Sequence, residues 1–364
     1  MKLITIVGAR PQFIKAAAIS RAIHQSSNIT EKIVHTGQHY DPNMSEIFFD
    51  EMDIPKPDYN LGVSNGGHGS MTGQMMINLE KIIQHERPDG VIVYGDTNST
   101  LAGALVASKL HIPVIHIEAG LRSFNMSMPE EINRILCDRI STLLFCPTQT
   151  AINNLKKEGY DNLDCKIFLS GDVMYDTIIY YSSILKDKIN LREKTNVKDD
   201  YILCTIHRAE NTDDEYRLNQ IFLALSIISD DIKVILPLHP RTKKLVQAYG
   251  IKYSENLKII DPVGYFDMLE LLTNSSMVMT DSGGLQKEAF FMAKPCVTLR
   301  DQTEWVELLD FGYNTLSGAN AEKIQLEYLK MKDVKIPDGH KLYGSGDAAG
   351  QIVKDINTYY SQMY

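Results

Sequence analysis

Acidic side chains stand where several short apolar runs of this sequence end, and they are the residues best suited to chemistry. Asp96 and Glu118 each follow such a run, and Glu130 stands where a helical pattern begins. Carboxylates gathered in a partly dry cleft raise one another's pKa values, so that one can hold a proton while another accepts one. These three residues are therefore candidates for general acid–base catalysis.

Positive charge near the acids supports this interpretation, although each acid also has a structural alternative. The basic side chains expected nearby are Arg10, Lys15 and His207. Asp96 could instead cap a helix, and Glu130 and Glu131 could be first-turn partners of a helix dipole. The residues alone leave both alternatives open.

A second candidate site is the segment Thr280-Asp281-Ser282-Gly283-Gly284-Leu285-Gln286-Lys287-Glu288. An apolar strand runs into it and a helix follows, so Gly283 and Gly284 stand where unpaired N–H groups and the helix dipole favour phosphate. Glu288 lies one turn further along, and its carboxylate suits the paired hydroxyls of a ribose. The alternative is an ordinary strand–helix connection with a surface glutamate.

Together with other residues, this candidate phosphate site could hold a nucleoside diphosphate. The guanidinium of Arg208 matches phosphate oxygens, and Tyr265 and Phe266 offer aromatic surface to a base. The first strand is not followed by GxGxxG, which argues against NAD, and GxxxxGK[ST] is missing, which argues against a P-loop. Since the histidines lack metal-ligand spacing, we expect no metal, and His39 and His116 are expected to be structural rather than catalytic. With the nucleotide-cofactor motifs also missing, no cofactor is expected.

Apolar runs of about five residues alternate with helical patterns along the whole chain. This alternation predicts an α/β fold with doubly wound parallel sheets. The strands expected are 3–7, 32–35, 90–94, 113–117 and 143–146, and then 201–206, 233–238, 257–260, 276–279 and 295–299.

The strand pattern restarts after a polar helical stretch, so two Rossmann-like domains are expected, 1–170 and 171–347, facing across a cleft. Ligands of such sheets bind beyond the carboxyl ends of the strands. The polar motifs fall there in both halves, which adds Arg122 and His239 as candidates for substrate binding.

Composition describes an ordinary globular protein of 364 residues with 44% hydrophobic and 23% charged residues. The net charge of −9 argues against a nucleic-acid surface. Five cysteines without metal-like spacing indicate free thiols in a reducing compartment. Neither a signal peptide nor a membrane-spanning run is found, so a cytoplasmic location is expected.

Six motifs in order resemble the bacterial non-hydrolysing UDP-N-acetylglucosamine 2-epimerases, and the resemblance spans essentially the whole chain. The motifs are Gly8-Ala9-Arg10-Pro11-Gln12-Phe13-Ile14-Lys15, Gly95-Asp96-Thr97, His116-Ile117-Glu118-Ala119-Gly120-Leu121-Arg122, Pro129-Glu130-Glu131-Ile132-Asn133-Arg134, His207-Arg208 and Thr280-Asp281-Ser282-Gly283-Gly284. The resemblance implies the two-domain GT-B architecture, with a C-terminal helix over 348–364 that crosses back to the first domain. It also implies a homodimer.

The reaction implied by the resemblance is reversible inversion at C2 of a UDP-linked 2-acetamido sugar, from UDP-GlcNAc to UDP-ManNAc, for surface polysaccharide. A base removes the C2 proton while UDP leaves, and UDP adds again to the 2-acetamidoglucal after reprotonation on the other face. A glycosyltransferase of the same architecture and a hydrolysing epimerase are the alternatives.

Matching positions assign roles to individual residues. The acid–base candidates become Asp96, Glu118 and Glu130, with His207 near the diphosphate. The residues implied to bind substrate are Arg10, Lys15, Arg122, Arg134, Arg208, His239, Tyr265, Phe266, Ser282, Gly283, Gly284 and Glu288. Gln38 and His39 match part of a region at which UDP-GlcNAc activates simple members of the family.

Two departures bear on the substrate. Gln12 replaces the usual Glu after Arg-Pro, and Ala209 replaces the usual second Arg after His-Arg. The runs His-Arg-Ala-Glu-Asn at 207–211 and Ser-Phe-Asn at 123–125 look more like the branch acting on UDP-2,3-diacetamido-2,3-dideoxyglucuronate. That sugar nucleotide is therefore the alternative to UDP-GlcNAc.

Overall fold

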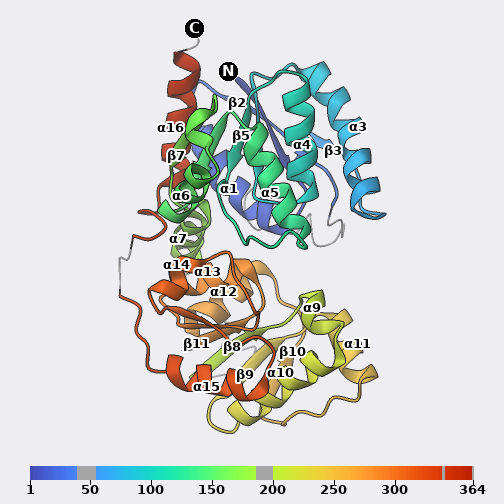
Figure 1. Cartoon of the computed structure of the whole chain (residues 1–364), viewed down its shortest axis with the longest axis vertical. Coiled ribbons are helices and arrows are strands. Elements are labelled where there is room, and N and C mark those ends of the chain that lie inside the picture. Colours follow the sequence, from blue (N-terminus) through green and yellow to red (C-terminus); the bar gives the residue numbers. More distant parts are fainter. Residues whose placement is uncertain (39–54, 186–199, 338–340, 363–364) are drawn as a thin grey trace. The chain divides into compact units, whose positions relative to one another are not determined.

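The computed structural model describes residues 1–38, 55–185, 200–337 and 341–362. The chain divides into two compact units (Figure 1). The first comprises Met1–Ile179 with Lys341–Tyr364, and the second comprises Tyr180–His340. Each unit is built around its own parallel sheet, which confirms the predicted α/β fold class.

The first unit holds a seven-stranded sheet in the order β3-β2-β1-β4-β5-β6-β7. Its strands are β1 (Lys2–Val7), β2 (Thr30–His35), β3 (Tyr59–Asn60), β4 (Gly90–Tyr94), β5 (Val114–Ile117), β6 (Leu143–Cys146) and β7 (Lys166–Leu169). All five residues of β4 and all four of β5 are buried, as a parallel sheet covered on both faces requires.

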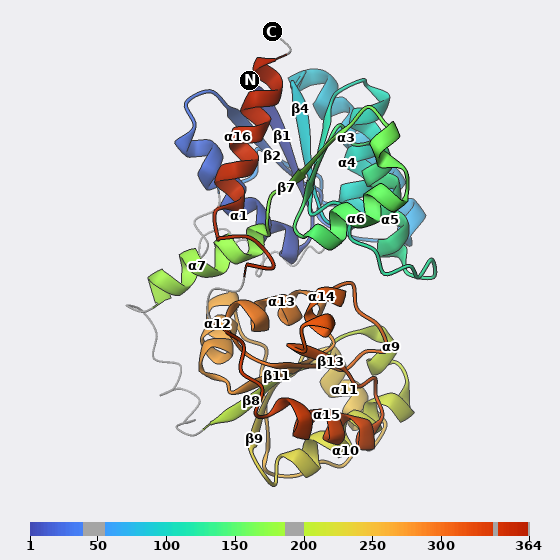
Figure 2. The same cartoon turned by 60° about the vertical axis from the view of Figure 1, so that its left-hand side comes forward.

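Helices cover both faces of this sheet (Figure 2). The α3 (His68–Glu86), α4 (Asn98–Lys109) and α5 (Pro129–Ile140) helices lie side by side on one face, and α1 (Arg10–Gln25) and α16 (Ala348–Ser361) lie on the other. The other elements of this unit that the structure describes are α6 (Gln149–Lys157), η1 (Tyr160–Asn162) and α7 (Val173–Leu185), and α7 contains the division between the units.

The last helix of the chain is fixed to the first unit by side-chain hydrogen bonds. The Tyr360 hydroxyl donates to the carbonyl of Asp89 at 2.9 Å, and Asn357 donates to the Ser26 hydroxyl at the end of α1. At the other end of α16, Asp176 accepts from the amides of 348 and 349. The C-terminal segment thus packs against α1 and the start of β4.

The second unit holds a six-stranded sheet in the order β10-β9-β8-β11-β12-β13. Its strands are β8 (Tyr201–Thr205), β9 (Lys233–Pro237), β10 (Leu257–Ile260), β11 (Met277–Thr280), β12 (Cys296–Thr298) and β13 (Asn314–Leu316). Its helices are α9 (Ala209–Thr212), α10 (Glu215–Ile228), α11 (Pro240–Ala248), α12 (Tyr265–Asn274), α13 (Gly283–Phe291), α14 (Val306–Asp310) and α15 (Ala321–Met331). Apolar side chains of α10 and α15 form one continuous core with the strands.

All ten predicted strands are present, within two residues at each end, but three further strands were missed. The missed strands β3, β7 and β13 each lie at an edge of a sheet. The missed strands have two, four and three residues, and β7 shows no fully buried residue, so their signal is weaker than that of a central strand. The other edge strand of the described sheets, β10, was predicted. Within the described ranges, no helix is both long and apolar enough to cross a bilayer.

The strand order reverses once in each sheet, and this point positions the polar motifs. The reversal lies between β1 and β4 in the first unit and between β8 and β11 in the second. The segments that leave the carboxyl ends of two such strands run in opposite directions and open a crevice for a ligand. Those segments carry Arg10 and Asp96 in the first unit, and His207 and Ser282 in the second.

Candidate active site

One buried amide joins the two loops at the reversal point of the first unit. Gln12 Oε1 accepts from the amides of Gly8 and Ala9 at 2.8 and 3.1 Å. Its Nε2 donates to the carbonyl of Tyr94 and to Thr100 Oγ1, both at 2.9 Å. Because Tyr94 ends β4, this side chain couples the loop after β1 to the loop that carries the candidate acid at position 96.

Glu118 and Lys15 form a buried ion pair beside that loop. Glu118 follows β5 with a left-handed backbone, at φ 71°, and its carboxylate contacts the Lys15 ammonium from α1. A Cβ added to Gly95 would lie 3.3 Å from the Lys15 nitrogen and 3.4 Å from Glu118 Oε2, so this pair lies directly over Gly95. The structure therefore brings Lys15, Glu118 and the Gly95–Asp96 turn together.

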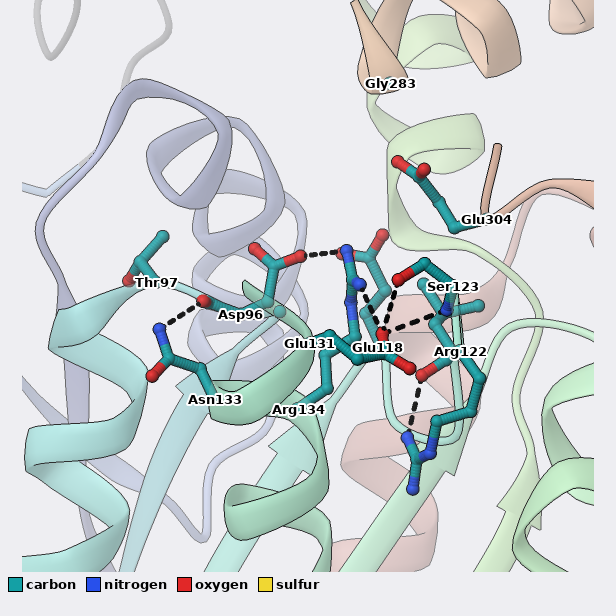
Figure 3. A network of polar contacts seen from close by, with 12 residues as sticks. Asp96, Thr97, Glu118, Arg122, Ser123, Glu131, Asn133, Arg134, Gly283 and Glu304 are labelled. Atoms are coloured by element: carbon teal, nitrogen blue, oxygen red, sulfur yellow. Dashed lines mark hydrogen bonds and ion pairs between the residues drawn. The ribbon is translucent and has the colours of Figure 1, made fainter. Parts of the chain in front are cut away.

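Asp96 belongs to a chain of charged groups that ends on α5 (Figure 3). Arg134 donates to Asp96 Oδ2 at 2.5 Å and to Glu131 Oε2 at 2.9 Å, and Asn133 donates to the carbonyl of Asp96 at 2.8 Å. The cap of α4 is Thr97, whose hydroxyl accepts from the amide three residues later. The capping alternative for Asp96 is thus excluded, and its carboxylate is left for an ionic role.

The two adjacent glutamates of α5 differ in their surroundings. Glu131 is fully buried and accepts from the amides of Ser123 and Phe124 at 2.9 and 2.8 Å, so it holds the loop after β5 (Figure 3). Glu130 is half-buried in the first turn of the helix. The buried glutamate is structural, and the half-buried one is available to a ligand.

Arg122 lies in a buried cluster that engages nearly all of its guanidinium. It donates to both carboxylate oxygens of Glu158 at 2.7 and 2.8 Å, to Asp138 at 2.7 Å and to the Leu121 carbonyl at 2.7 Å. Burial alone would raise the pKa of Asp138, but His116 and Arg122 together lower it. Four of five N–H groups are in use, which favours a structural role over the predicted substrate contact.

Asp281 joins the two loops at the reversal point of the second unit, as Gln12 does in the first. Its carboxylate accepts from the amides of His207 at 3.1 Å and Arg208 at 3.0 Å, and from Asn211 Nδ2 at 3.2 Å. Burial opposes ionisation, but the contacts with His207 and its neighbours lower the pKa of Asp281. His207 Nδ1 lies 3.1 Å from Asp281 while 54% of the His207 side chain is exposed, which leaves Nε2 open to a ligand.

The predicted phosphate turn begins α13. Ser282 caps the helix by accepting from the Leu285 amide, and the Gly283 carbonyl accepts from Trp305 Nε1 at 2.9 Å. An added Cβ at Gly283 would collide with Glu304 Oε1, whereas at Gly284 the nearest atom is 4.0 Å away. A side chain at Gly283 would therefore force the buried Glu304 carboxylate, which pairs with Arg300 and lies at this helix start, to shift.

Two neighbours of this turn, Glu304 and Trp305, were not identified from the sequence. The Lys287 ammonium lies 4.0 Å from the centre of the Trp305 ring, and Arg300 pairs with Glu304 at 3.1 Å. Glu288 is buried on the same helix. No local pattern places Trp305 or Glu304 at this turn, because Gly283, which both approach, lies about twenty positions earlier in the chain.

The remaining predicted residues differ in how the structure places them. Tyr265 and Phe266 begin α12 and pack against the Tyr181 ring, with centroids 6.1 and 5.2 Å away. His239 is exposed and caps α11 by accepting from the Arg241 amide.

The structure describes only some of the predicted residues that follow the first two strands. Gln38 Oε1 accepts from the amide and hydroxyl of Ser99 at 3.0 and 2.8 Å. His39 lies outside the described residues, and the side chain of Arg10 is not described. Among the described residues, no three histidine, cysteine or acidic side chains form a group able to hold a metal ion.

Comparisons with known proteins give one consistent family. The sequence model described as UDP-N-acetylglucosamine 2-epimerase matches residues 21–357. A UDP-2,3-diacetamido-2,3-dideoxy-D-glucuronate 2-epimerase from Pseudomonas aeruginosa is 54% identical, covering 97% of this chain and 99% of the relative. The crystal structure of Methanocaldococcus jannaschii UDP-GlcNAc 2-epimerase in complex with UDP-GlcNAc and UDP is 45% identical, with a TM-score of 0.90 and coverage of 99% and 100%. This chain therefore belongs to the UDP-N-acetylglucosamine 2-epimerase family.

Proposed function

We propose that this protein catalyses reversible epimerisation at C2 of a UDP-linked 2-acetamido sugar. The observation that carries the proposal is the pair of carboxylates beyond adjacent strands of the first unit. Asp96 is paired with Arg134, and Glu118 with Lys15. Acids held beside cations at the carboxyl ends of parallel strands suit proton transfer to and from a bound ligand.

The proposed chemistry is an elimination followed by an addition. A carboxylate takes the C2 proton, the C2–H electrons form the C1–C2 double bond, and the bond from C1 to the UDP oxygen breaks. Protonation of C2 on the opposite face and re-addition of UDP at C1 complete the inversion. Asp96, Glu118 and Glu130 are the proposed acid–base groups.

The second unit supplies the proposed contacts with UDP. The start of α13 and Arg208 would hold the diphosphate, Glu288 the ribose, and Tyr265 with Phe266 the base. His207 is proposed to act at the leaving oxygen, because its contact with Asp281 fixes Nδ1 and leaves Nε2 open. Re-addition requires that UDP stay bound, which makes this contact surface part of the mechanism.

Two sugar nucleotides fit the proposal, and the reaction products distinguish epimerisation from hydrolysis and glycosyl transfer. UDP-GlcNAc is the first candidate, and the 54% identity to the Pseudomonas aeruginosa enzyme favours the diacetamido uronate as the second. We expect NMR to detect UDP-ManNAc, or the C2 epimer of the uronate, without accumulation of UDP. Stoichiometric UDP with free N-acetylmannosamine would indicate hydrolysis, and sugar on an added acceptor would indicate a glycosyltransferase. Either result would refute the proposal.

A homodimer and a cytoplasmic location, both expected from the sequence, remain predictions. Light scattering during size-exclusion chromatography gives the mass in solution, which is 41.1 kDa for one chain. A mass near twice this value would support the dimer, and a mass near this value would refute it.

A further inference from the structure

A buried histidine lies between two hydrogen-bond acceptors in the first unit. His116 is on β5 and is completely buried. Its Nδ1 lies 2.7 Å from Asp138 Oδ1, and its Nε2 lies 2.8 Å from the carbonyl oxygen of Gly95. A carbonyl oxygen and an ionised carboxylate only accept, whereas a neutral imidazole carries one N–H. Both contacts are satisfied together only when both ring nitrogens are protonated.

The charges around the ring agree with an imidazolium. Asp138 and Arg122 are buried beside it, and Glu158 closes the cluster from a partly exposed position. With a neutral ring, two carboxylates would face one guanidinium, whereas the imidazolium balances the cluster. Burial raises the pKa values of the neighbouring cysteine and tyrosine side chains at 137, 146 and 160, so these groups add no charge at neutral pH. Of the charged neighbours, Asp96 is paired with Arg134, and Arg139 lies over the Tyr160 ring.

The same cluster forms hydrogen bonds with both turns that carry the candidate acids. Gly95 directly precedes Asp96 and has a left-handed backbone, with φ 61°. Asp138 Oδ2 accepts from the amide of Gly120 at 3.1 Å, two residues after Glu118. The Gly95 carbonyl and the Gly120 amide are thereby fixed in the turns that follow β4 and β5.

We propose that His116 is a positioning residue whose imidazolium holds the Gly95 carbonyl and so places the Asp96 carboxylate. The inference rests on the proposed function, in which Asp96 transfers a proton. Displacing a reacting group by about 1 Å can lower the rate about 100-fold, so one hydrogen bond at this turn is enough to affect turnover.

Two amide substitutions separate the contacts of the ring. In His116→Gln the amide nitrogen can reach the position of Nε2 and keep the bond to Gly95, whereas in His116→Asn it reaches only the position of Nδ1. We expect His116→Asn to lower kcat about 100-fold with KM little changed, and His116→Gln to keep most of the activity. Equal kcat values in the two variants, or wild-type kcat in His116→Asn, would overturn the positioning role.

The protonation state is tested on the wild-type protein, which removes any dependence on how the variants fold. In protein with ¹⁵N-labelled histidine, we expect two protonated ring nitrogens for His116 at pH 7.5, where a free imidazole is mostly neutral. The signal is assigned by its loss in His116→Asn, or by its correlations within β5 if that variant does not fold. One unprotonated nitrogen would overturn the inference even in an active enzyme. Failure of the wild type to epimerise any UDP-sugar would refute the proposed function alone.

Discussion

Gln12→Glu replaces the amide nitrogen of a buried side chain by oxygen, and its expected effect on stability follows from the hydrogen bonds that this nitrogen donates. The amide nitrogen of Gln12 donates to the Tyr94 carbonyl and to Thr100, and only 1% of the residue is exposed. An ionised glutamate would place a carboxylate oxygen against the Tyr94 carbonyl and lose both bonds. The two acceptors keep a second donor each, because the Thr100 hydroxyl donates to the Tyr94 carbonyl and the Thr97 amide donates to Thr100. The cost therefore comes from the buried carboxylate oxygen that faces a carbonyl without a donor. Such a group costs about 1–3 kcal/mol when neutral and more when charged, so we expect the variant to lose about 2–4 kcal/mol of unfolding free energy at pH 8.

This loss should depend on pH in a direction that can be derived. A neutral glutamic acid can still donate to the Tyr94 carbonyl, so folding favours the protonated form and raises the pKa of the new carboxyl above that of the unfolded chain. The folded variant then binds more protons than the unfolded one, and its stability relative to wild type falls as pH rises from about 4 towards the folded pKa. The loss should therefore be smaller at pH 5 than at pH 8.

Chemical unfolding of wild type and variant at both pH values measures this effect. The matched control is Gln25→Glu, because Gln25 is an exposed glutamine on the same helix, and exposed substitutions stay within about 0.5 kcal/mol. Gln12→Glu as stable as wild type at pH 8, or a pH dependence equal to that of the control, would refute the reasoning.

Further predictions concern the second unit. Gly283→Ala should lower the free energy of unfolding by about 1–3 kcal/mol, because the new methyl group collides with Glu304 Oε1. The open position at Gly284 should accept alanine with a gain of about 0.5 kcal/mol. Equal effects of the two substitutions in thermal unfolding would contradict the geometry. Asp281→Asn should destabilise the protein by about 2–4 kcal/mol at neutral pH, because charge-assisted bonds to the His207 loop are lost. The pKa of Asp281 is lowered on folding, so this contribution is complete above the ordinary value of 3.8 and is lost as pH falls through the folded value; a difference from wild type that persists unchanged at pH 2–3 would be inconsistent with it. Glu288→Ala should weaken UDP binding in calorimetry by about 1.5–3 kcal/mol while leaving the fold intact, and unchanged affinity would remove Glu288 from the proposed site.

The central strands were predictable from the sequence because each is an apolar run buried on both faces. Edge strands were harder to recognise, because they are short and only partly buried: Lys166–Leu169 was missed, whereas the edge strand Leu257–Ile260 was predicted. The carboxyl ends of the central strands were predictable for the same reason, and the acidic residues Asp96 and Glu118 could therefore be placed there from the sequence alone.

The residues that hold the loops could not be found in the same way. Gln12 bonds to Tyr94, 82 positions away, and Asp281 bonds to His207, 74 positions away. Local patterns carry no sign of such partners, and a lone Gln or Asp beside a strand looks the same whether it is buried or exposed. Arg122 was assigned to substrate for this reason, whereas its guanidinium is engaged by Asp138 and Glu158.

Proton exchange at C2 tests the central claim most directly. In deuterated water with UDP-GlcNAc or the diacetamido uronate, we expect the wild type to place solvent deuterium at C2 of both epimers, as followed by proton NMR. Asp96→Asn and Glu118→Gln should lose this exchange while still binding UDP by calorimetry. Epimerisation with retention of the original C2 hydrogen, or full exchange in both variants, would contradict the account.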